Sequence, residues 1–249
     1  MSRTSRTRWV TGSAVALALL FAGAATVASA RGDGPDGGHA HAASAPVVRV
    51  PSDTSADAGF ARDMSVHHQQ AVEMSFIVRD RTRDEDVRRL AYDIANTQAN
   101  QRGMLLGWLD LWELPKVATD EEPMAWMAAP GHGAHHMDGT DDMAGMEGME
   151  GMKGAGGGYQ AHDGSLMPGM ATRTELARLR AADGKAAEIL YLQLMTDHHR
   201  GGVDMALGCV RLCTVTAEKR LARGMVDAQR SELDAMAAML AERGAKPRP

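Results

Sequence analysis

Four long stretches of the chain place apolar residues at the three- and four-residue spacing of an α-helix. They cover about residues 57–80, 84–113, 185–212 and 216–243, and none contains an internal proline. A capping box formed by Thr82 and Glu85 is expected to begin the second stretch, and Pro115 closes it. Another capping box, Thr172 with Glu175, opens a short helix before the third stretch. The pattern predicts an all-α protein built from two helical hairpins.

The second hairpin repeats the first. A shift of 131 residues places His67 on His198 and continues without a gap for about fifty residues. The paired positions include Met64 with Met195, His68 with His199, Met74 with Met205, Gln98 with Gln229 and Leu109 with Leu240. Each hairpin has an apolar stripe that it cannot bury alone. We therefore expect an antiparallel four-helix bundle with pseudo-twofold symmetry.

The repeated motif, Met, two residues, His-His, five residues, Met, lies on the stripe that faces the bundle. At about 100° per residue, one face of each first helix collects the following residues: Phe60, Met64, His67, Ala71, Met74 and Val78, and Tyr191, Met195, His198, Gly202, Met205 and Cys209. Cys213 extends the second stripe by one turn, whereas His68 and His199 lie at the stripe edges. Small residues beside each histidine leave room for a close approach of the two helices.

Thioethers and imidazoles that share one interior form a ligand set for a soft metal ion such as Cu(I), and a poor one for Mg²⁺ or Ca²⁺. The candidate ligands are Met64, His67, His68, Met74, Met195, His198, His199 and Met205. The alternative is ordinary packing, because Met often fills cores. We assign the methionines of the second helices to the core: Met104, Met225, Met236 and Met239.

Other polar residues have two open interpretations each. Gln98 and Gln229 interrupt the apolar stripes of the second helices, so they either hydrogen-bond the His rings and fix their tautomers, or bond each other or lie at the stripe edge. Cys209 and Cys213, the only cysteines, form a disulfide or chelate a soft metal when reduced.

Composition gives the insert between the hairpins, residues 116–171, a chemistry of its own. The chain has 18 Met and 10 His, and many of them lie in this Gly-rich segment. Disordered linkers are not normally enriched in Met, so we interpret the insert as a weaker trap for several copper or silver ions, with an inert spacer as the alternative. Its candidate ligands are His132, His135, His136, Met137, Met143, Met146, Met149, Met152, Met167 and Met170.

The N-terminus predicts export. Arginines precede an apolar stretch, and Ala28-Ser29-Ala30 is typical of cleavage after Ala30, so residues 1–30 form a signal peptide and leave no stable membrane span. An uncleaved anchor is the alternative. The remaining predicted parts are a linker (31–56), the first hairpin (57–115), the second hairpin with its short leading helix (172–244) and a tail (245–249). The net charge of -5 gives no basic surface for nucleic acid.

The doubled His-His motif, the sequence LMPGM at 166–170 and the Trp108-Leu109 pair resemble the bacterial family of exported domains of unknown function that includes the cyanobacterial periplasmic copper-binding protein CopM. The resemblance covers about residues 57–244. It implies a ferritin-like four-helix bundle, copper binding through the Met and His residues of the doubled motif, and a role in copper tolerance.

Two classes of function therefore compete. One is a non-enzymatic protein that sequesters copper or passes it to a partner protein outside the membrane, and the other is a ferritin-like metal oxidase. A di-iron oxidase needs Glu-x-x-His pairs, but the residues three before His67 and His198 are Met64 and Met195. We therefore expect no enzymatic activity. A purely structural module is a third possibility, and it would leave the Met-rich insert unexplained.

Overall fold

The computed structural model describes residues 50–118, 120–128 and 159–249, and these residues are helical, without a strand among them. The helices are α1 (Ala56–Arg81), α2 (Glu85–Leu111), the 3₁₀ helix η1 (Ala125–Met127), α3 (Arg173–Ala181), α4 (Gly184–Leu212) and α5 (Thr216–Glu242). The four long helices end within two residues of the predicted ranges. The all-α prediction is confirmed.

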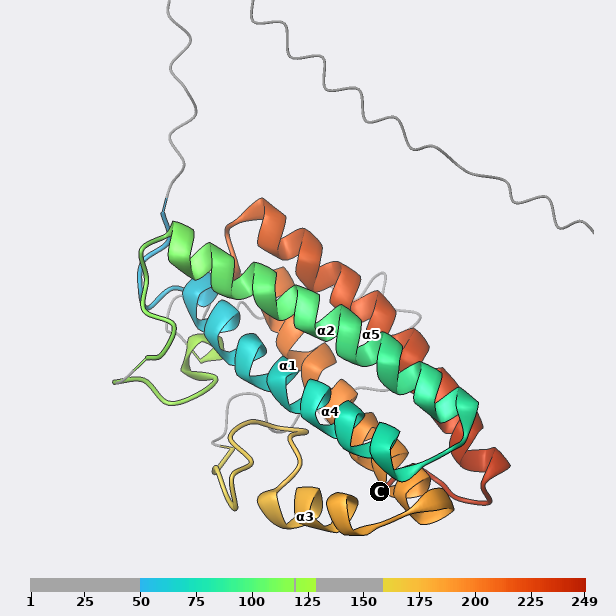
Figure 1. The fold of residues 1–249 in the computed structure, drawn as a ribbon. Helices are drawn as coiled ribbons and strands as arrows, with labels where there is room; N and C mark the ends of the chain where they lie inside the picture. The colour runs from blue at the N-terminus through green and yellow to red at the C-terminus, as the bar shows by residue number, and fades with distance from the viewer. Residues whose placement is uncertain (1–49, 119, 129–158) are drawn as a thin grey trace, which may run out of the picture. The chain divides into compact units, whose positions relative to one another are not determined.

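The long helices form two antiparallel hairpins (Figure 1). Three residues, 82–84, connect α1 to α2, and three residues, 213–215, connect α4 to α5. Within each hairpin the helices pack along their length, and the hairpins pack against each other through α1 and α4, while α3 lies against both of these helices. The predicted bundle of two repeated hairpins is thus the observed architecture.

The helix starts agree only in part with the predicted caps. Thr172 accepts a hydrogen bond from the Glu175 N–H, and the Glu175 side chain accepts one from the Thr172 N–H, so the capping box of α3 is confirmed. The predicted box at Thr82 is wrong. Thr82 ends α1, with its N–H donated to the Val78 carbonyl, and Asp84 caps α2 instead by accepting hydrogen bonds from two backbone N–H groups of the first turn.

Two apolar clusters fill the bundle, one toward each end. The first contains Phe60, Met64, Leu105, Leu109, Trp126, Met167, Met205, Cys209 and Met225, and the second contains Met74, Ile94, Leu179, Tyr191, Leu192, Met195 and Met236. Met225 and Met236 are fully buried, and Met239 packs at the edge of the second cluster. The core assignment of Met104 is wrong: its side chain is 43% exposed, because neighbouring Leu105 takes the inward position.

A buried ionic network joins the hairpins at one end of the bundle. Glu188 of α4 accepts hydrogen bonds from Thr82 Oγ1 (2.5 Å) and Arg243 Nε (2.8 Å). The same guanidinium lies 2.9 Å from an oxygen of Asp84. The network links the α1–α2 connection, α4 and the end of α5, so the two hairpins are held by polar contacts as well as by the core.

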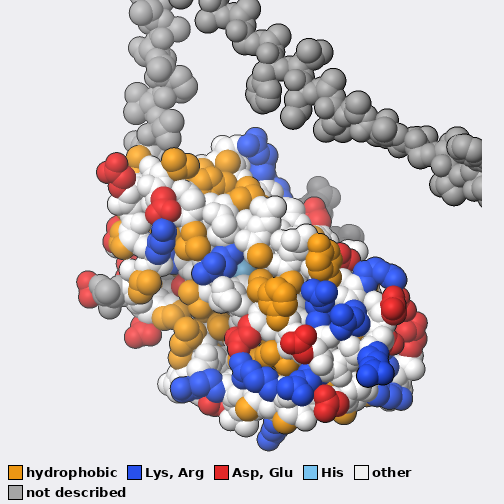
Figure 2. Space-filling view, in the orientation of Figure 1, with side chains coloured by type: hydrophobic (Ala, Val, Ile, Leu, Met, Phe, Trp, Pro, Cys, Tyr) orange, Lys and Arg blue, Asp and Glu red, His pale blue; other side chains and the backbone are white. Residues whose placement is uncertain are grey.

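Charges of both signs are interspersed over the face of the molecule seen in Figure 2, with apolar side chains between them. No helix of the described residues has the length and apolar character needed to cross a membrane.

Candidate metal centre

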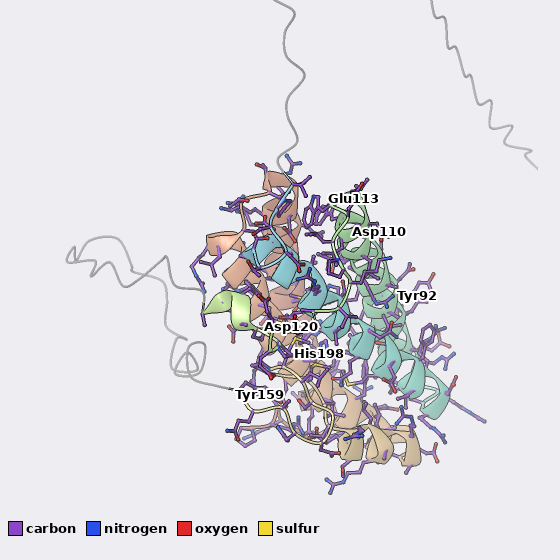
Figure 3. The ribbon with its side chains drawn as sticks, turned by 90° about the vertical axis from the view of Figure 1, so that its left-hand side faces the viewer. Tyr92, Asp110, Glu113, Asp120, Tyr159 and His198 are labelled. Atoms are coloured by element: carbon purple, nitrogen blue, oxygen red, sulfur yellow. A yellow bond between two sulfur atoms is a disulfide. The ribbon has the colours of Figure 1, made fainter. Side chains whose placement is uncertain are left out.

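His67 and His198 stack on each other where α1 crosses α4. Their ring centroids are 3.7 Å apart with an interplanar angle of 31°, and both side chains are buried. His198 lies at mid-height of the bundle in Figure 3, whereas Tyr92 of α2 is half exposed on the outside. The repeat therefore brings its two central imidazoles into direct contact.

Thioethers lie on both sides of this imidazole pair. Because α1 and α4 run antiparallel, Met64 shares one buried cluster with Met205, and Met74 shares the other cluster with Met195. All four methionines have no exposed surface. Each cluster next to the His pair thus receives one methionine from each copy of the repeat.

His68 and His199 are also fully buried, and each bonds to the second helix of its own hairpin. His68 Nε2 lies 2.8 Å from Gln101 Oε1, and His199 Nε2 lies 2.6 Å from Glu232 Oε2. Both acceptors are oxygens, so each Nε2 carries the proton and donates it, which leaves Nδ1 with a lone pair. Neither Nδ1 has a hydrogen-bond partner.

Of the central pair, His198 has the same hydrogen-bond pattern as His68 and His199. His198 Nε2 donates to the His67 carbonyl at 3.0 Å, and His198 Nδ1 has no partner. Neither nitrogen of His67 meets hydrogen-bond geometry, although the Pro168 carbonyl lies close to the ring. Three imidazoles thus have Nε2 fixed by an oxygen and Nδ1 free, which is the arrangement found around metal-binding histidines.

The oxygen atoms that hold the rings belong to neither Gln98 nor Gln229, so the first of the two open interpretations of these glutamines is not observed. Gln98 and Gln229 do not hydrogen-bond the imidazoles; Gln101 and Glu232, one turn further along α2 and α5, do so. The amide of Gln98 is buried without a partner. Gln229 packs against Gly202, where an added Cβ would lie 2.5 Å from the amide oxygen. The same 131-residue offset relates Gln101 to Glu232, so the repeat contained the signal for the correct pair.

Burial lowers the pKa of three of these imidazoles, those of His67, His68 and His198. Desolvation, followed by the neighbouring His68 and His199, holds the pKa of His67 well below its ordinary value of 6.5. Desolvation and then the His67 ring lower the pKa of His198 in the same way. For His68, burial lowers the pKa to about 3, against the opposing effect of its bond to Gln101. A metal ion would therefore meet lone pairs that protons do not occupy near neutral pH.

Residues 166–171 cover this region from outside the repeat. The Gln70 side chain donates to the Ala171 carbonyl (2.9 Å) and accepts from its N–H (2.7 Å). Gly201, the repeat partner of Gln70, lies against Pro168, whose carbonyl oxygen would overlap any Cβ there. Met167 is buried in the cluster of Met64 and Met205, and Met170 packs at its edge. Two candidate ligands of the insert therefore lie beside the bundle.

Cys209 and Cys213 form a disulfide at the end of α4, which decides between the two interpretations for the state described. Burial, followed by the Asp57 carboxylate, raises the pKa of the nearby Glu218 to about 10. Among the described residues, Cys209, Cys213 and Glu218 are the one group of three His, Cys, Asp or Glu side chains whose ligand atoms lie within 4.8 Å of one another. The four histidines do not bring three nitrogens that close.

The remaining candidate ligands of the insert lie outside the described residues, as do the predicted signal peptide and most of the linker. The candidates are His132, His135, His136, Met137, Met143, Met146, Met149 and Met152.

Residues 57–240 match a protein family described as a domain of unknown function, DUF305, and the chain belongs to this family. A DUF305 protein from Streptomyces coelicolor, described as secreted, is 59% identical, with a TM-score of 0.63 over 80% of this chain and 99% of that chain. A DUF305 fragment from Deinococcus radiodurans is 25% identical, with a TM-score of 0.53 over 75% of this chain and 96% of that chain.

CopM in its Cu(I)-bound form is 16% identical, with a TM-score of 0.50 over 75% of this chain and 96% of that chain. At that identity the likeness shows the fold alone. No curated protein matches the chain. The resemblance drawn from the doubled His-His motif is confirmed at the level of the family.

Proposed function

We propose that this protein binds copper as Cu(I), and also Ag(I), outside the cytoplasm, at a centre made by the doubled motif. One observation carries the proposal: four buried imidazoles, three of them with Nε2 donated to an oxygen, each keep an Nδ1 without a partner. Buried polar atoms normally have partners. Four unpartnered Nδ1 atoms in one region are better explained by a ligand than by packing.

The surrounding atoms favour a soft ion over a hard one. The His pair lies between two thioether pairs, Met64 with Met205 and Met74 with Met195, and sulfur ligands select Cu(I) over Mg²⁺ or Ca²⁺. Burial excludes the water molecules that a hard ion would retain. The fold shared with CopM, whose structure is described in a Cu(I)-bound form, supports the same choice.

The role that fits such a centre is sequestration, trafficking or tolerance of copper, with transfer to a partner protein as one form of it. We expect binding without turnover, because Met occupies the positions three before His67 and His198 where a di-iron oxidase would need Glu. The secreted description of the Streptomyces coelicolor relative supports an extracytoplasmic location.

The test is a competition titration of the mature protein against a chromophoric Cu(I) chelator, with His67→Ala, His198→Ala and the double variant. Each single change should weaken the tightest bound ion at least about tenfold, or about 1.4 kcal/mol. The double change should weaken it by clearly less than the sum, because both residues act on one ion. Met104→Leu, on an exposed thioether, is the matched control and should bind like the wild type.

A preference for Zn(II) over Cu(I) in the same titration would contradict the proposal. So would unchanged Cu(I) affinity in the double variant together with a loss of stability of the metal-free protein, because the histidines would then serve packing alone.

A further inference from the structure

Glu218 is a buried carboxyl group that the fold does not explain. It has no exposed surface, no N–H or hydroxyl group donates to its oxygens, and its polar neighbours are the Asp57 carboxyl group and the two cysteines. A Glu at the third position of a helix usually accepts a hydrogen bond from the backbone N–H of the capping residue. In α5 that residue is Val215, and its N–H is already donated to Asp57 of α1 at 2.7 Å.

Asp57 binds the start of α5 through further hydrogen bonds. Its Oδ1 also accepts from the Thr214 N–H at 2.8 Å, and its Oδ2 accepts from the Thr214 hydroxyl at 3.2 Å. Asp57 thus caps α5 from another helix and displaces Glu218 from its usual role. Glu218 lies next to Asp57 and beside Cys209 and Cys213, with ligand atoms of Glu218 and the two cysteines within 4.8 Å of one another.

We propose that reduction of the Cys209–Cys213 disulfide opens a second metal site, in which the two thiolates and the Glu218 carboxylate bind one thiophilic cation, Cu(I) or Zn(II). Thiolates select these ions, and carboxylates complete many zinc sites. Metal–sulfur distances of about 2.3 Å and metal–oxygen distances of about 2.1 Å require donors separated by less than about 4.5 Å. The ligand atoms of the three residues lie within 4.8 Å of one another while the disulfide is intact, so small shifts of the side chains bring them to this spacing.

The site lies away from the imidazoles of the centre proposed above (called the His–Met centre), although Met205 of that centre is one turn from Cys209 on α4. Cys209 follows His198 by eleven residues along α4, which at 1.5 Å per residue is about 16 Å. A cleft lined by Ser52, Asp57 and Trp112, and by the residues on both sides of Cys213, lies at this end of the bundle. The two cysteines are buried, so their reduction requires local opening beside this cleft. In Figure 1 the α4–α5 connection lies at the end of the bundle where α1 begins and α2 ends.

The reaction balances with an external dithiol as the reductant. Its thiolate attacks one sulfur of the disulfide, the S–S bond breaks, and a second attack within the reductant releases both protein thiols. Two electrons and two protons pass to Cys209 and Cys213, and the reductant ends as its own disulfide. Metal binding then forms two metal–sulfur bonds and one metal–oxygen bond, and it releases the two thiol protons and the proton of the Glu218 carboxyl group.

The experiment uses the full mature chain under anaerobic conditions, with the disulfide either intact or reduced and the reductant removed. Zn(II) and Cu(I) are titrated separately, and ions per chain are counted alongside thiolate-to-metal charge-transfer absorption. Reduction should add one ion per chain with this absorption. Cys209→Ser with Cys213→Ser should abolish the added ion, and Glu218→Gln should weaken it at least about tenfold.

His67→Ala with His198→Ala is the matched control and should leave the added ion unchanged, so failure here is distinguishable from failure of the His–Met centre. Equal binding by the intact and reduced protein would overturn the proposal. So would an added ion held equally well by Glu218→Gln, because the carboxylate would then not be a ligand. If Glu218→Gln unfolds, Glu218→Asp, with its shorter carboxylate, should show the same weakening.

Discussion

His68 makes the buried histidine cluster testable without any metal. Its ring is fully buried, its Nε2–H is donated to Gln101, and burial lowers its pKa to about 3. In the unfolded chain the same ring should titrate near 6.5. Below about pH 6.5 the His68 ring binds a proton in the unfolded chain but not in the folded protein. The free energy of unfolding therefore has its full value above about pH 6.5 and falls as the pH drops toward 3.

The size of the effect follows from linkage. Each pH unit in this window is worth about 1.36 kcal/mol, so lowering the pH from about 7.5 to about 5.0 should remove about 2 kcal/mol through His68 alone. His67 and His198 act in the same direction, because their pKa values are also lowered. Glu218 acts in the opposite direction, because its raised pKa of about 10 makes the folded state gain stability on acidification.

The informative measurement is therefore a difference between two proteins. Urea unfolding of the metal-free wild type and of His68→Gln, followed by circular dichroism at both pH values in a chelator, isolates the contribution of one ring. Gln keeps an N–H donor for Gln101. The wild type should lose about 2 kcal/mol more than His68→Gln on acidification, and His162→Gln, on an exposed ring, should behave as the wild type. Equal losses in wild type and His68→Gln would show that the folded ring accepts a proton at pH 5, and would refute the reasoning.

Two further substitutions test the packing around the centre by thermal and urea unfolding. Gly201→Ala should lower the free energy of unfolding by about 2 kcal/mol, because the added Cβ would overlap the Pro168 carbonyl. Gly224→Ala, in open space on α5, should raise the free energy of unfolding by about 0.5 kcal/mol. Similar effects at both glycines would contradict the close approach of Pro168 to Gly201. Arg243→Ala should lower the free energy of unfolding by about 3 kcal/mol, because the buried Glu188 carboxylate and the partly exposed Asp84 carboxylate lose their partner. Arg89→Ala, in an exposed ion pair, should change it by less than about 0.5 kcal/mol, and a comparable loss there would argue against the network.

The bundle could be predicted from the sequence because every level of the pattern agreed. Apolar spacing gave the helix ranges, and the exact offset of the repeat required two similar hairpins that bury their stripes together. The stacking of His67 on His198 follows from that symmetry, since equivalent central residues of two antiparallel copies meet at the crossing point. The internal symmetry of the sequence thus implies where the central His pair lies.

The hydrogen-bond partners of the rings could not be predicted with the same certainty. Gln98 and Gln101 lie one turn apart on the same side of α2, and periodicity alone does not say which of them is level with His68. Helix register depends on how the two helices of the hairpin pack, and a three-residue connection fixes it only approximately. The exposure of Met104 was missed for a related reason, because a stripe edge shifts by a full residue with a small rotation of the helix.

Equivalent positions of the two hairpins that carry different residues explain why the centre is not symmetric. Gln70 and Gly201 are partners under the 131-residue shift, yet one carries a long amide and the other no side chain. Both contact the same segment: Gln70 binds Ala171 through two hydrogen bonds, and Gly201 admits Pro168. A single segment that covers both halves has no twofold symmetry of its own, so it contacts different residues in the two hairpins. The departure from the repeat is therefore itself a signal that a third element packs on the α1–α4 crossing, beside His67.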